Sequence, residues 1–447
     1  MKNRFKKPNH LIAVITFAFL ILGLLSMCVG QAVAIMKDRG ILPADPNPYV
    51  STSVDWASIY PVREENQTDT SAMADKTEQP AAVPSETRRR TVLDRFYNLI
   101  VKLGRTEADL EQHFLLRTKL IELSGYSNRL LGKTDFGEAN SVVRLSNGHL
   151  SSTYQWDGHN KPEIDQQAEE IASFSDWLDQ RGTKFFYVQI PTKIDPYDEN
   201  PVNKTVNLNN DYYDYYLSQI QAAGLDTMDL RETLHDAPKD HYDYFFKTDG
   251  HWTLEAGRLA AGAIADHLNG ILNSKVLDTS VLNPELYSEK TYERWFLGAL
   301  GRKVTLGYAT PDDFTVYYPK FETRFHVKAP DKDLDRTGSF DEVMFNNDLL
   351  NTKDYYGTSI YEAVGQGNRP LIQFTNQNCS NDLKVLFIRD SFSLAVIPYF
   401  SLMVHQSDWI DVRPTNGNFT GSLKTYIEDT NPDVVILMYD MMNYKIQ

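Results

Sequence analysis

The sequence contains few cysteines and no excess of positive charge. Only 2 cysteines occur in 447 residues, and one of them, Cys28, lies in an apolar N-terminal run. Cys379 is therefore alone in the rest of the chain, which excludes a disulfide framework. Lys and Arg number 45 against 60 Asp and Glu, and the formal net charge is −15. Because binding to nucleic acid needs Lys and Arg in place of the phosphate counterions, this balance argues against a nucleic-acid partner.

Patterns of metal ligands and internal repeats are also missing. The central histidines are too widely spaced for a pair of ligands on one helix, and no cysteine cluster accompanies them. These histidines are His235, His241, His251 and His267. We therefore predict neither a metal site nor another cofactor. Hydrophobic residues make up 42% of the chain, which is enough for a large core and excludes disorder throughout.

The N-terminus is basic and is followed by a long uncharged stretch. Residues 11–36 contain no charged side chain, and this stretch is long enough to cross a hydrocarbon layer of about 30 Å. The Lys and Arg residues before it place that end in the cytoplasm. We expect a transmembrane anchor in a bacterial cell membrane at 1–37, with the remaining chain outside the cytoplasm. Residues 32–34 also fit a signal-peptide cleavage site, so secretion after cleavage is the alternative.

Composition divides the remaining chain into three parts. Residues 38–90 are rich in proline and polar residues without an apolar period, which predicts a disordered linker. A helical apolar pattern over 91–131 predicts a helical stalk. Residues 132–447 are predicted to form the catalytic domain, with a β-rich insertion at about 273–383.

The predicted domain alternates helices with short apolar strands. Strands are expected at 184–190, 384–388 and 434–438, and helices at 253–268 and 392–404. This alternation predicts an α/β fold with a parallel sheet that is covered by helices on both faces.

One buried strand ends directly in a turn that carries a serine. The apolar residues 384–388 are followed by Arg389, Asp390 and Ser391 and then by an apolar helix. In open α/β sheets the functional residues lie beyond the carboxyl ends of the strands. Such a turn exposes the serine hydroxyl and directs the amides of the following helix toward a developing oxyanion. An Asp-Ser pair at a helix start is also an ordinary N-cap, and this structural role stays open.

A second polar loop supplies the groups that would activate a serine. Asp249, Gly250 and His251 lie just before the helix that is predicted from Thr253. A serine hydroxyl is a weak nucleophile and needs a base such as imidazole, which works best when a carboxylate fixes its tautomer. The structural alternative is that Asp249 and Thr253 cap the helix while His251 packs.

The two motifs together resemble those of a known family. A T-D-x-H-W-T motif before a helix, with a later strand ending in D-S-F, is similar to the DHHW proteins and to the alginate O-acetyltransferases of the AlgX/AlgJ type. These proteins belong to the SGNH hydrolase-like superfamily, and the resemblance covers 135–447. It implies a flavodoxin-like sheet with a circularly permuted motif order. It further implies that Ser391 is the nucleophile, His251 the general base and Asp249 the carboxylate that orients the base.

The sequence departs from the family pattern in three places. Gly250 stands where the DHHW motif has a second histidine, and Arg389 replaces the glycine of the usual G-D-S block. No G-x-N-D block is visible, so the side chain that would stabilise the oxyanion is not identified. Asn368 and Arg413 are weak candidates for this role or for substrate contact.

A rival nucleophile lies upstream of the D-S-F motif. Residues 357–359 resemble the G-T-S stretch that carries the serine in alginate acetyltransferases, so Ser359 is the alternative nucleophile. The residues before it are polar, whereas Ser391 follows a clear buried strand. We therefore prefer Ser391.

These features predict an extracytoplasmic O-acetyltransferase that acts on a cell-surface or secreted polysaccharide. An acetyl group on the serine would pass to a sugar hydroxyl, or to water in a carbohydrate acetylesterase with the same triad. A non-catalytic protein that keeps the fold and binds glycan is a further alternative. By analogy, the resemblance implies a membrane-bound O-acyltransferase as the partner that donates acetyl groups.

Overall fold

The computed structural model describes most of the chain beyond residue 116. The described residues are 117–136, 142–152, 156–197, 210–274, 276–332, 334–413, 419 and 422–438. The predicted anchor, the predicted linker and most of the predicted stalk lie outside these residues. Within the described part, every helix is too short or too polar to span a bilayer.

The chain divides into two compact units, Met1–Ser124 and Gly125–Gln447. In the first unit only the start of helix α4 (Arg117–Leu130) is described. The second unit contains every other described element, and it is the subject of the following paragraphs.

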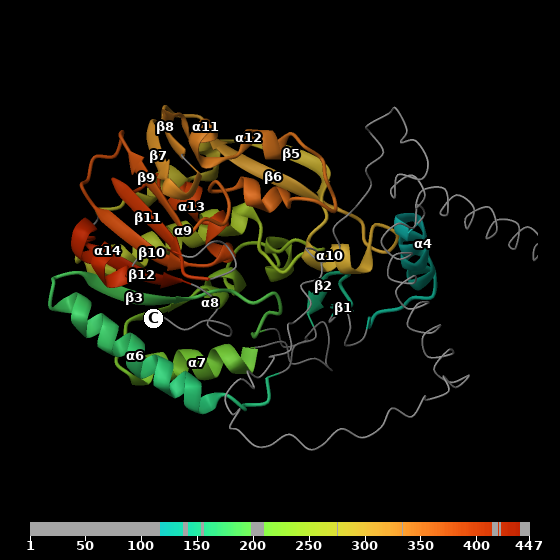
Figure 1. Cartoon of the computed structure of the whole chain (residues 1–447), viewed down its shortest axis with the longest axis horizontal. Helices are drawn as coiled ribbons and strands as arrows, with labels where there is room; N and C mark the ends of the chain where they lie inside the picture. Colours follow the sequence, from blue (N-terminus) through green and yellow to red (C-terminus); the bar gives the residue numbers. More distant parts are fainter. Residues whose placement is uncertain are drawn as a thin grey trace, which may run out of the picture. The chain divides into compact units, whose positions relative to one another are not determined.

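An eight-stranded sheet forms the centre of the second unit, in the order β4-β3-β12-β10-β11-β9-β7-β8 (Figure 1). Its parallel strands are β3 (Lys184–Gln189), β4 (Thr227–Asp229), β10 (Lys384–Arg389), β11 (Gln406–Asp411) and β12 (Val434–Met438). Its antiparallel strands are β7 (Phe325–Ala329), β8 (Leu334–Gly338) and β9 (Leu371–Asn376).

The predicted parallel sheet is present, but the sheet as a whole is mixed, because it continues with antiparallel strands at one edge. The three antiparallel strands all come from the predicted insertion at 273–383, which continues the sheet beyond β11. β9 alternates between buried and half-buried residues, whereas every residue of β12 is buried. Such alternation is typical of antiparallel strands and continuous burial of parallel ones. The β-rich character of the insertion was predicted from the sequence, but the pairing of its strands with the main sheet was not.

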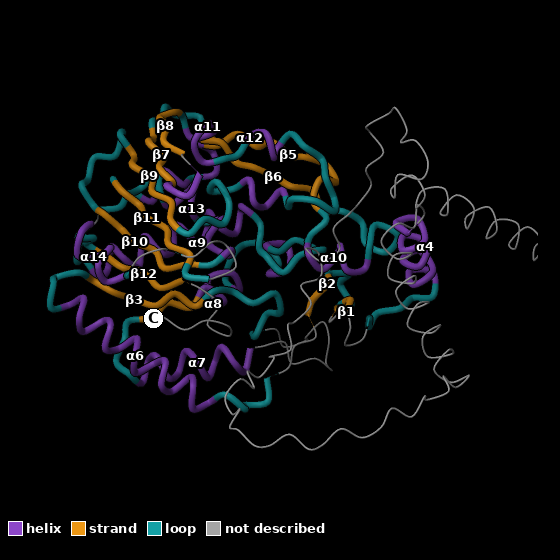
Figure 2. Tube along the Cα trace, viewed as in Figure 1, coloured by secondary structure: helices purple, strands orange, loops and turns teal. Residues whose placement is uncertain are grey.

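Helices cover both faces of the sheet, as predicted (Figure 2). Alternate side chains of one strand reach opposite faces: Phe186 belongs to one core with α9 (Leu254–Ile271) and Tyr187 to another. The first core also includes α8 and α13, and the second includes α6, α7 and α14. These helices are α6 (Lys161–Asp179), α7 (Asn210–Ala222), α8 (Leu230–His235), α13 (Ile397–Phe400) and α14 (Leu423–Thr430).

Smaller elements complete the domain. The hairpins are β1 (Val142–Arg144) with β2 (Leu150–Ser152), and β5 (Tyr287–Phe296) with β6 (Asp312–Pro319). The short α-helices are α10 (Ala299–Val304), α11 (Phe340–Met344) and α12 (Asn347–Leu350). The 3-10 turns are η1 (His241–Tyr244), η2 (Thr279–Leu282), η3 (Pro284–Leu286), η4 (Pro330–Lys332), η5 (Ile360–Ala363) and η6 (Ser391–Ala395).

The segment after β10 is not the continuous helix that the sequence predicts. Residues 391–395 form the 3-10 turn η6, and an α-helix begins only at Ile397. Pro398 lies in the first turn of α13. Because proline is tolerated at a helix start but clashes with the carbonyl four residues earlier in a helix interior, it favours this break.

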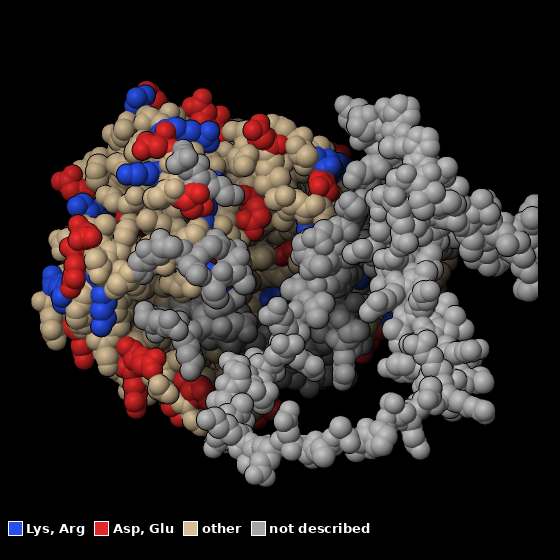
Figure 3. Space-filling view, viewed as in Figure 1, with Lys and Arg blue, Asp and Glu red and all other residues tan. Residues whose placement is uncertain are grey.

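Acidic side chains lie on the solvent side of the domain. The outer face of α6 exposes carboxylates, and Figure 3 shows acidic groups along this edge of the described surface. The exposed acidic residues of α6 are Glu163, Asp165, Glu169, Glu170, Asp176 and Asp179. The acidic residues of this region therefore form the solvent-exposed polar face of α6.

Candidate active site

The end of β10 and the loop before α9 bring the predicted motifs together. Ser391 lies two residues beyond Arg389, the last residue of β10, and His251 lies in the loop between η1 and α9. The Nε2 atom of His251 lies 2.8 Å from the Oγ atom of Ser391, although 140 positions separate them in the sequence. This is a hydrogen-bond distance, so the imidazole is placed to accept the proton of the serine hydroxyl.

Asp249 holds the other side of the imidazole. Its Oδ1 atom lies 2.5 Å from His251 Nδ1 and also accepts the backbone N–H of His251 at 2.9 Å. Its Oδ2 atom accepts the N–H of Ala299 at 2.6 Å. The carboxylate thus selects the tautomer with the proton on Nδ1, which leaves Nε2 free to accept from Ser391.

Burial and charge act in opposite directions on this pair. Burial alone would raise the pKa of Asp249, but His251 and the two backbone N–H donors outweigh it and lower that pKa to about 2. Burial likewise tends to lower the pKa of His251, and the adjacent Asp249 carboxylate raises it above its usual value. Asp249 is therefore ionised at neutral pH, and His251 gains a proton more readily than a free histidine.

This raised pKa predicts the acid limb of a pH–activity profile. His251 must be neutral to act as a base, so activity should fall as the pH decreases through its pKa. We expect the pH at which kcat/KM for an acetyl ester is half-maximal to lie above 6.5, the usual pKa of histidine. A midpoint at or below 6.5 would contradict the assigned role of Asp249.

Aromatic rings enclose the imidazole. Tyr361 of η5 stacks on His251 with ring centroids 4.6 Å apart, and Phe392 lies at 4.9 Å. The indole N–H of Trp252 donates to the carbonyl of Phe392 at 2.8 Å, which joins the histidine loop to the serine turn. Phe392 and Trp252 flank the predicted residues. Tyr361 was missed because no sequence pattern links η5 to this loop.

The start of α10 also contacts the loop, and the sequence analysis missed it. A Cβ atom at Gly298 would lie 2.3 Å from the Cβ atom of Asp249, so only glycine fits here. The N–H of Gly298 donates to Thr248 Oγ1 at 2.9 Å, next to the donation by Ala299 to Asp249. The glycines in the sequence L-G-A-L-G at 297–301 were the available signal.

The structural alternatives for both motifs are also present. Asp390 caps η6 by accepting the N–H of Phe392 at 2.8 Å, and Thr253 caps α9 by accepting the N–H of Ala256 at 3.3 Å. Asp249 accepts from His251 and Ala299 and leaves the cap of α9 to Thr253. Capping therefore accompanies the Ser391–His251 pairing and does not replace it.

Asn368 and Arg413 belong to a polar network around Arg389. The side chain of Arg389 is fully buried and donates to Asn368 Oδ1 at 2.8 Å. Arg413 donates to the same oxygen at 3.2 Å and to Asp411 at 2.6 Å. Asn368 donates its amide to Glu362 at 2.6 Å. Both weak candidates are thus engaged in this network, and neither is hydrogen-bonded to Ser391 in the described structure.

The network predicts a large effect of Arg389 on stability. Replacing Arg389 by methionine would remove a donor from Asn368 and an ion-pair partner at 3.7 Å from buried Asp411. We expect the free energy of unfolding to fall by about 3–5 kcal/mol, as measured by urea denaturation. The matched change at exposed Arg324 should cost less than about 0.5 kcal/mol. Equal losses at the two positions would show that Arg389 does not hold the network.

Ser359 is placed at the start of η5. Its hydroxyl oxygen accepts the N–H of Tyr361 at 3.3 Å and so caps this turn. The described hydrogen bonds of the His251 side chain go to Asp249 and Ser391, and none goes to Ser359. The structure therefore pairs the imidazole with the preferred serine.

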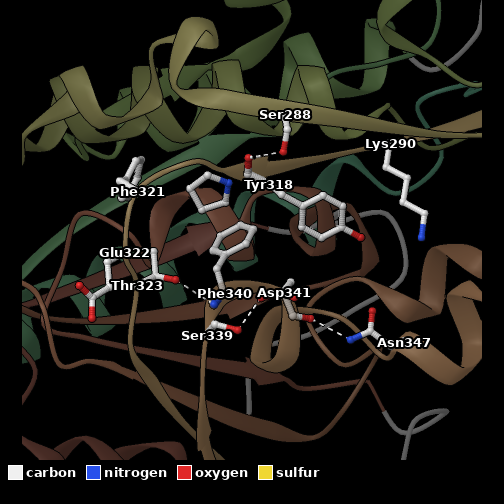
Figure 4. Close-up of a pocket in the computed structure, with 11 residues that line it drawn as sticks. Ser288, Lys290, Tyr318, Phe321, Glu322, Thr323, Ser339, Phe340, Asp341 and Asn347 are labelled. Atoms are coloured by element: carbon white, nitrogen blue, oxygen red, sulfur yellow. Dashed lines mark hydrogen bonds between the residues drawn. The ribbon is translucent and has the colours of Figure 1, made fainter.

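Of two hollows in the described surface, one adjoins the candidate active site and the other lies apart from it. A cavity of about 170 Å³ is lined in part by Lys193, Gly250 and Phe392 and adjoins the histidine loop. A hollow of about 560 Å³ lies between the β5–β6 hairpin and α11, where its lining includes Tyr318 and Asp341 (Figure 4). None of the site residues predicted from the sequence lines this larger hollow.

Potential metal ligands do not gather in the described part of the chain. No group of three or more His, Cys, Asp or Glu side chains there has an arrangement that would hold a metal ion.

Comparisons with known proteins were made for the whole chain. Residues 150–316 match the family model of the SGNH hydrolase-like domain of the acetyltransferase AlgX. No curated protein sequence matches the chain. The matched segment contains Asp249 and His251, whereas Ser391 lies beyond it.

Solved structures that are similar to the chain include the following two. PatB1 of Bacillus cereus shares 18% identity, with a TM-score of 0.52 over 67% of this chain and 95% of that one. A DHHW family protein from Eubacterium siraeum shares 17% identity, with a TM-score of 0.49 over 68% and 91% of the two chains. The likeness to PatB1 supports the SGNH-like α/β fold. Over residues 150–316 the chain thus matches the SGNH hydrolase-like domain family of the acetyltransferase AlgX, which confirms the resemblance predicted from the sequence.

Proposed function

We propose that this protein is an O-acetyltransferase that transfers acetyl groups to a polysaccharide through Ser391. The observation that carries this proposal is the line of contacts from Asp249 through His251 to Ser391, with its distances of 2.5 and 2.8 Å. The match to an acetyltransferase-type SGNH domain supports acetyl as the group that is transferred.

The proposed reaction has two steps. His251 Nε2 takes the proton of Ser391 while Oγ bonds to the carbonyl carbon of the acetyl donor. The bond to the leaving group then breaks, and His251 returns the proton to the leaving group. In the second step His251 deprotonates a sugar hydroxyl, which attacks the acetyl-serine and releases the serine oxygen, which regains the proton.

The serine turn offers one backbone donor for the oxyanion. The N–H of Phe392 donates to the Asp390 side chain, and the N–H of Ser393 donates to the Asp390 carbonyl. Among the described residues, the N–H of Ser391 itself has no hydrogen-bond acceptor. We assign this N–H to the developing oxyanion, where a preorganised donor contributes about 2.7–4 kcal/mol in comparable sites.

The small cavity beside the loop agrees with a short acyl group. Its volume is about 170 Å³, and Gly250 and Phe392 in its lining are neighbours of His251 and Ser391 in the sequence. The preference for acetyl over longer acyl groups rests on the match to the acetyltransferase family model.

A second candidate function is glycan binding without catalysis. The hollow in Figure 4 combines the aromatic side chains of Tyr318 and Phe321 with the polar groups of Lys290, Glu322 and Asp341. Ring faces with nearby hydrogen-bonding groups suit a sugar. This hollow has no serine–histidine pair in its lining, so it would bind and not react.

We further propose that the protein works at the bacterial cell membrane. The uncharged run at 11–36 would anchor it, and a membrane-bound O-acyltransferase would supply its acetyl groups. Secretion after cleavage near 32–34 is the alternative.

Competition between an acceptor and water tests the proposed function. The full chain in detergent is incubated with a chromogenic acetyl ester, with and without oligomannuronate or chitopentaose. Transferase activity predicts that acetyl groups appear on an oligosaccharide and that less free acetate forms. Rapid hydrolysis unaffected by both acceptors would favour an esterase. No acyl release, together with no labelling of Ser391 by a sulfonyl fluoride, would favour the binding protein.

A further inference from the structure

A buried lysine lies beside the loop that carries the proposed base. Lys193 follows β3 and is 7% exposed. Its Nζ atom donates to the carbonyl oxygens of Phe246 at 2.7 Å, Lys247 at 3.4 Å and Asp249 at 2.5 Å. One ammonium group therefore contacts three of the four residues 246–249.

The environment of this lysine is unusual. Lysine is almost never fully buried unless its charge is paired, yet the hydrogen-bond partners of Lys193 in the described structure are backbone carbonyls. Burial lowers the pKa of its ammonium group to about 7, although the charges of Asp249 and Asp312 oppose this. Retaining such a group costs free energy, which points to a role beyond filling space.

The lysine is the main described donor to the carbonyls of Phe246 and Asp249, whereas the carbonyl of Lys247 also accepts the N–H of Leu150 at 2.8 Å. The carbonyl of Asp249 has no other described donor, and the carbonyl of Phe246 has otherwise only a long contact of 3.5 Å with the Asp249 N–H. Thr248 is held separately, by Asp312 at 2.6 Å and by Gly298 at 2.9 Å. Without the lysine, the Asp249 carbonyl would lose its one described donor, while Thr248 and the Asp249 side chain would keep their hydrogen bonds.

We propose that Lys193 is a positioning residue, which fixes the Asp249 peptide so that His251 reaches Ser391. This inference rests on the proposed function at Ser391. Lys193 itself is not hydrogen-bonded to His251 or to Ser391 in the described structure. Its effect therefore passes through the backbone of the loop, where a displacement of about 1 Å is sufficient to reduce a rate about 100-fold.

Replacing Lys193 by methionine tests this role. Methionine keeps the unbranched apolar stem and removes all three donors. We expect kcat for the acetyl ester to fall about 10- to 100-fold, with KM changed less than about 3-fold, because the Nζ atom of Lys193 is engaged by the carbonyls of the loop. Rates are divided by the folded fraction from circular dichroism, so that lost stability alone does not lower them.

Thr183→Val is the matched control. Thr183 lies just before the other end of β3, is 3% exposed and donates its hydroxyl to the carbonyl of Pro432 at 2.9 Å. This variant also removes a buried donor to a carbonyl, but far along the strand from the loop. It should lower the thermal midpoint while kcat per folded molecule stays within about 2-fold of the original chain.

Chemical rescue separates positioning from a general packing defect. In a Cys28→Ser, Cys379→Ser background, Lys193→Cys provides a single thiol. Alkylation of the unfolded chain with bromoethylamine, followed by refolding, restores an ammonium group at nearly the original length. We expect at least about 10-fold recovery of kcat over the unalkylated variant.

The outcomes distinguish this inference from the proposed function. If the original chain has no Ser391-dependent activity, the proposed function fails and this inference fails with it. If the original chain is active and Lys193→Met keeps its kcat per folded molecule, only the role of Lys193 is overturned. If the Lys193→Met variant fails to fold, the alkylated Lys193→Cys variant decides the question. If alkylation restores folding but not kcat, the positioning role of Lys193 is also overturned.

Discussion

Ser391→Ala is expected to reduce acetyl-ester turnover at least about 10⁴-fold. The hydroxyl of Ser391 is the group that lies 2.8 Å from His251 Nε2, and alanine leaves the base without a nucleophile. Folding should be little affected, because the Ser391 side chain is half-buried and its turn is capped by Asp390. The measurement is kcat with a chromogenic acetyl ester, supported by the thermal midpoint.

Ser359→Ala is the matched control for this variant. Ser359 caps η5 through the N–H of Tyr361, so its loss should cost some stability and little activity. If Ser359→Ala abolishes turnover while Ser391→Ala retains it, the nucleophile has been assigned to the wrong serine.

Asp249→Asn should lower kcat by about 10⁴-fold with a small change in KM. The carboxylate fixes the Nδ1 proton of His251, whereas an amide is able to donate to Nδ1 and so favours the tautomer with the proton on Nε2. In that tautomer the imidazole cannot accept from Ser391. The size of the effect is that of the equivalent substitution in serine proteases.

Asp229→Asn is an isosteric control, which distinguishes the loss of a carboxylate at the site from the loss of one elsewhere in the domain. Asp229→Asn removes a carboxylate that pairs with Arg231 at 2.7 Å and caps α8. It should lower the free energy of unfolding and leave kcat unchanged. If Asp249→Asn behaves in the same way, with activity retained, the aspartate is structural and does not orient the base.

Local patterns were sufficient to predict where the triad residues meet. Strand β10 and the start of α9 are recognisable in the sequence as apolar runs. Each run adjoins a short polar segment that contains the site residues. Ser391 was expected beyond a strand end, and the resemblance to the DHHW and alginate acetyltransferase proteins implied that Asp249 and His251 lie close to it. The distance of 2.8 Å between His251 and Ser391 agrees with this expectation.

Contacts between distant segments were not predictable in the same way. Tyr361, Gly298 and Lys193 reach the loop from η5, the start of α10 and the end of β3. Each of these residues is ordinary in its own sequence context, and only the tertiary fold brings it to the loop. The antiparallel edge of the sheet was missed for a related reason, since strand pairing joins β9 to β11 across 30 or more positions.

The structure also explains how Arg389 is accommodated where the usual G-D-S block has glycine. Its guanidinium lies behind the serine turn and contacts Asn368 and the carbonyls of Gly367 and Arg369. The arginine therefore binds the 366–369 loop to the end of β10. This arrangement explains how the D-S-F turn accommodates a large residue at this position.

The most direct test of the account is to trap the acyl group on the enzyme. The full chain is mixed with the acetyl ester, quenched with acid at short times, digested and analysed by mass spectrometry. The account predicts an acetyl group on the peptide that contains Ser391, absent in Ser391→Ala and lost when an accepting oligosaccharide is added. Turnover of the ester with no acetylated Ser391, or with the acetyl group on Ser359, would contradict it.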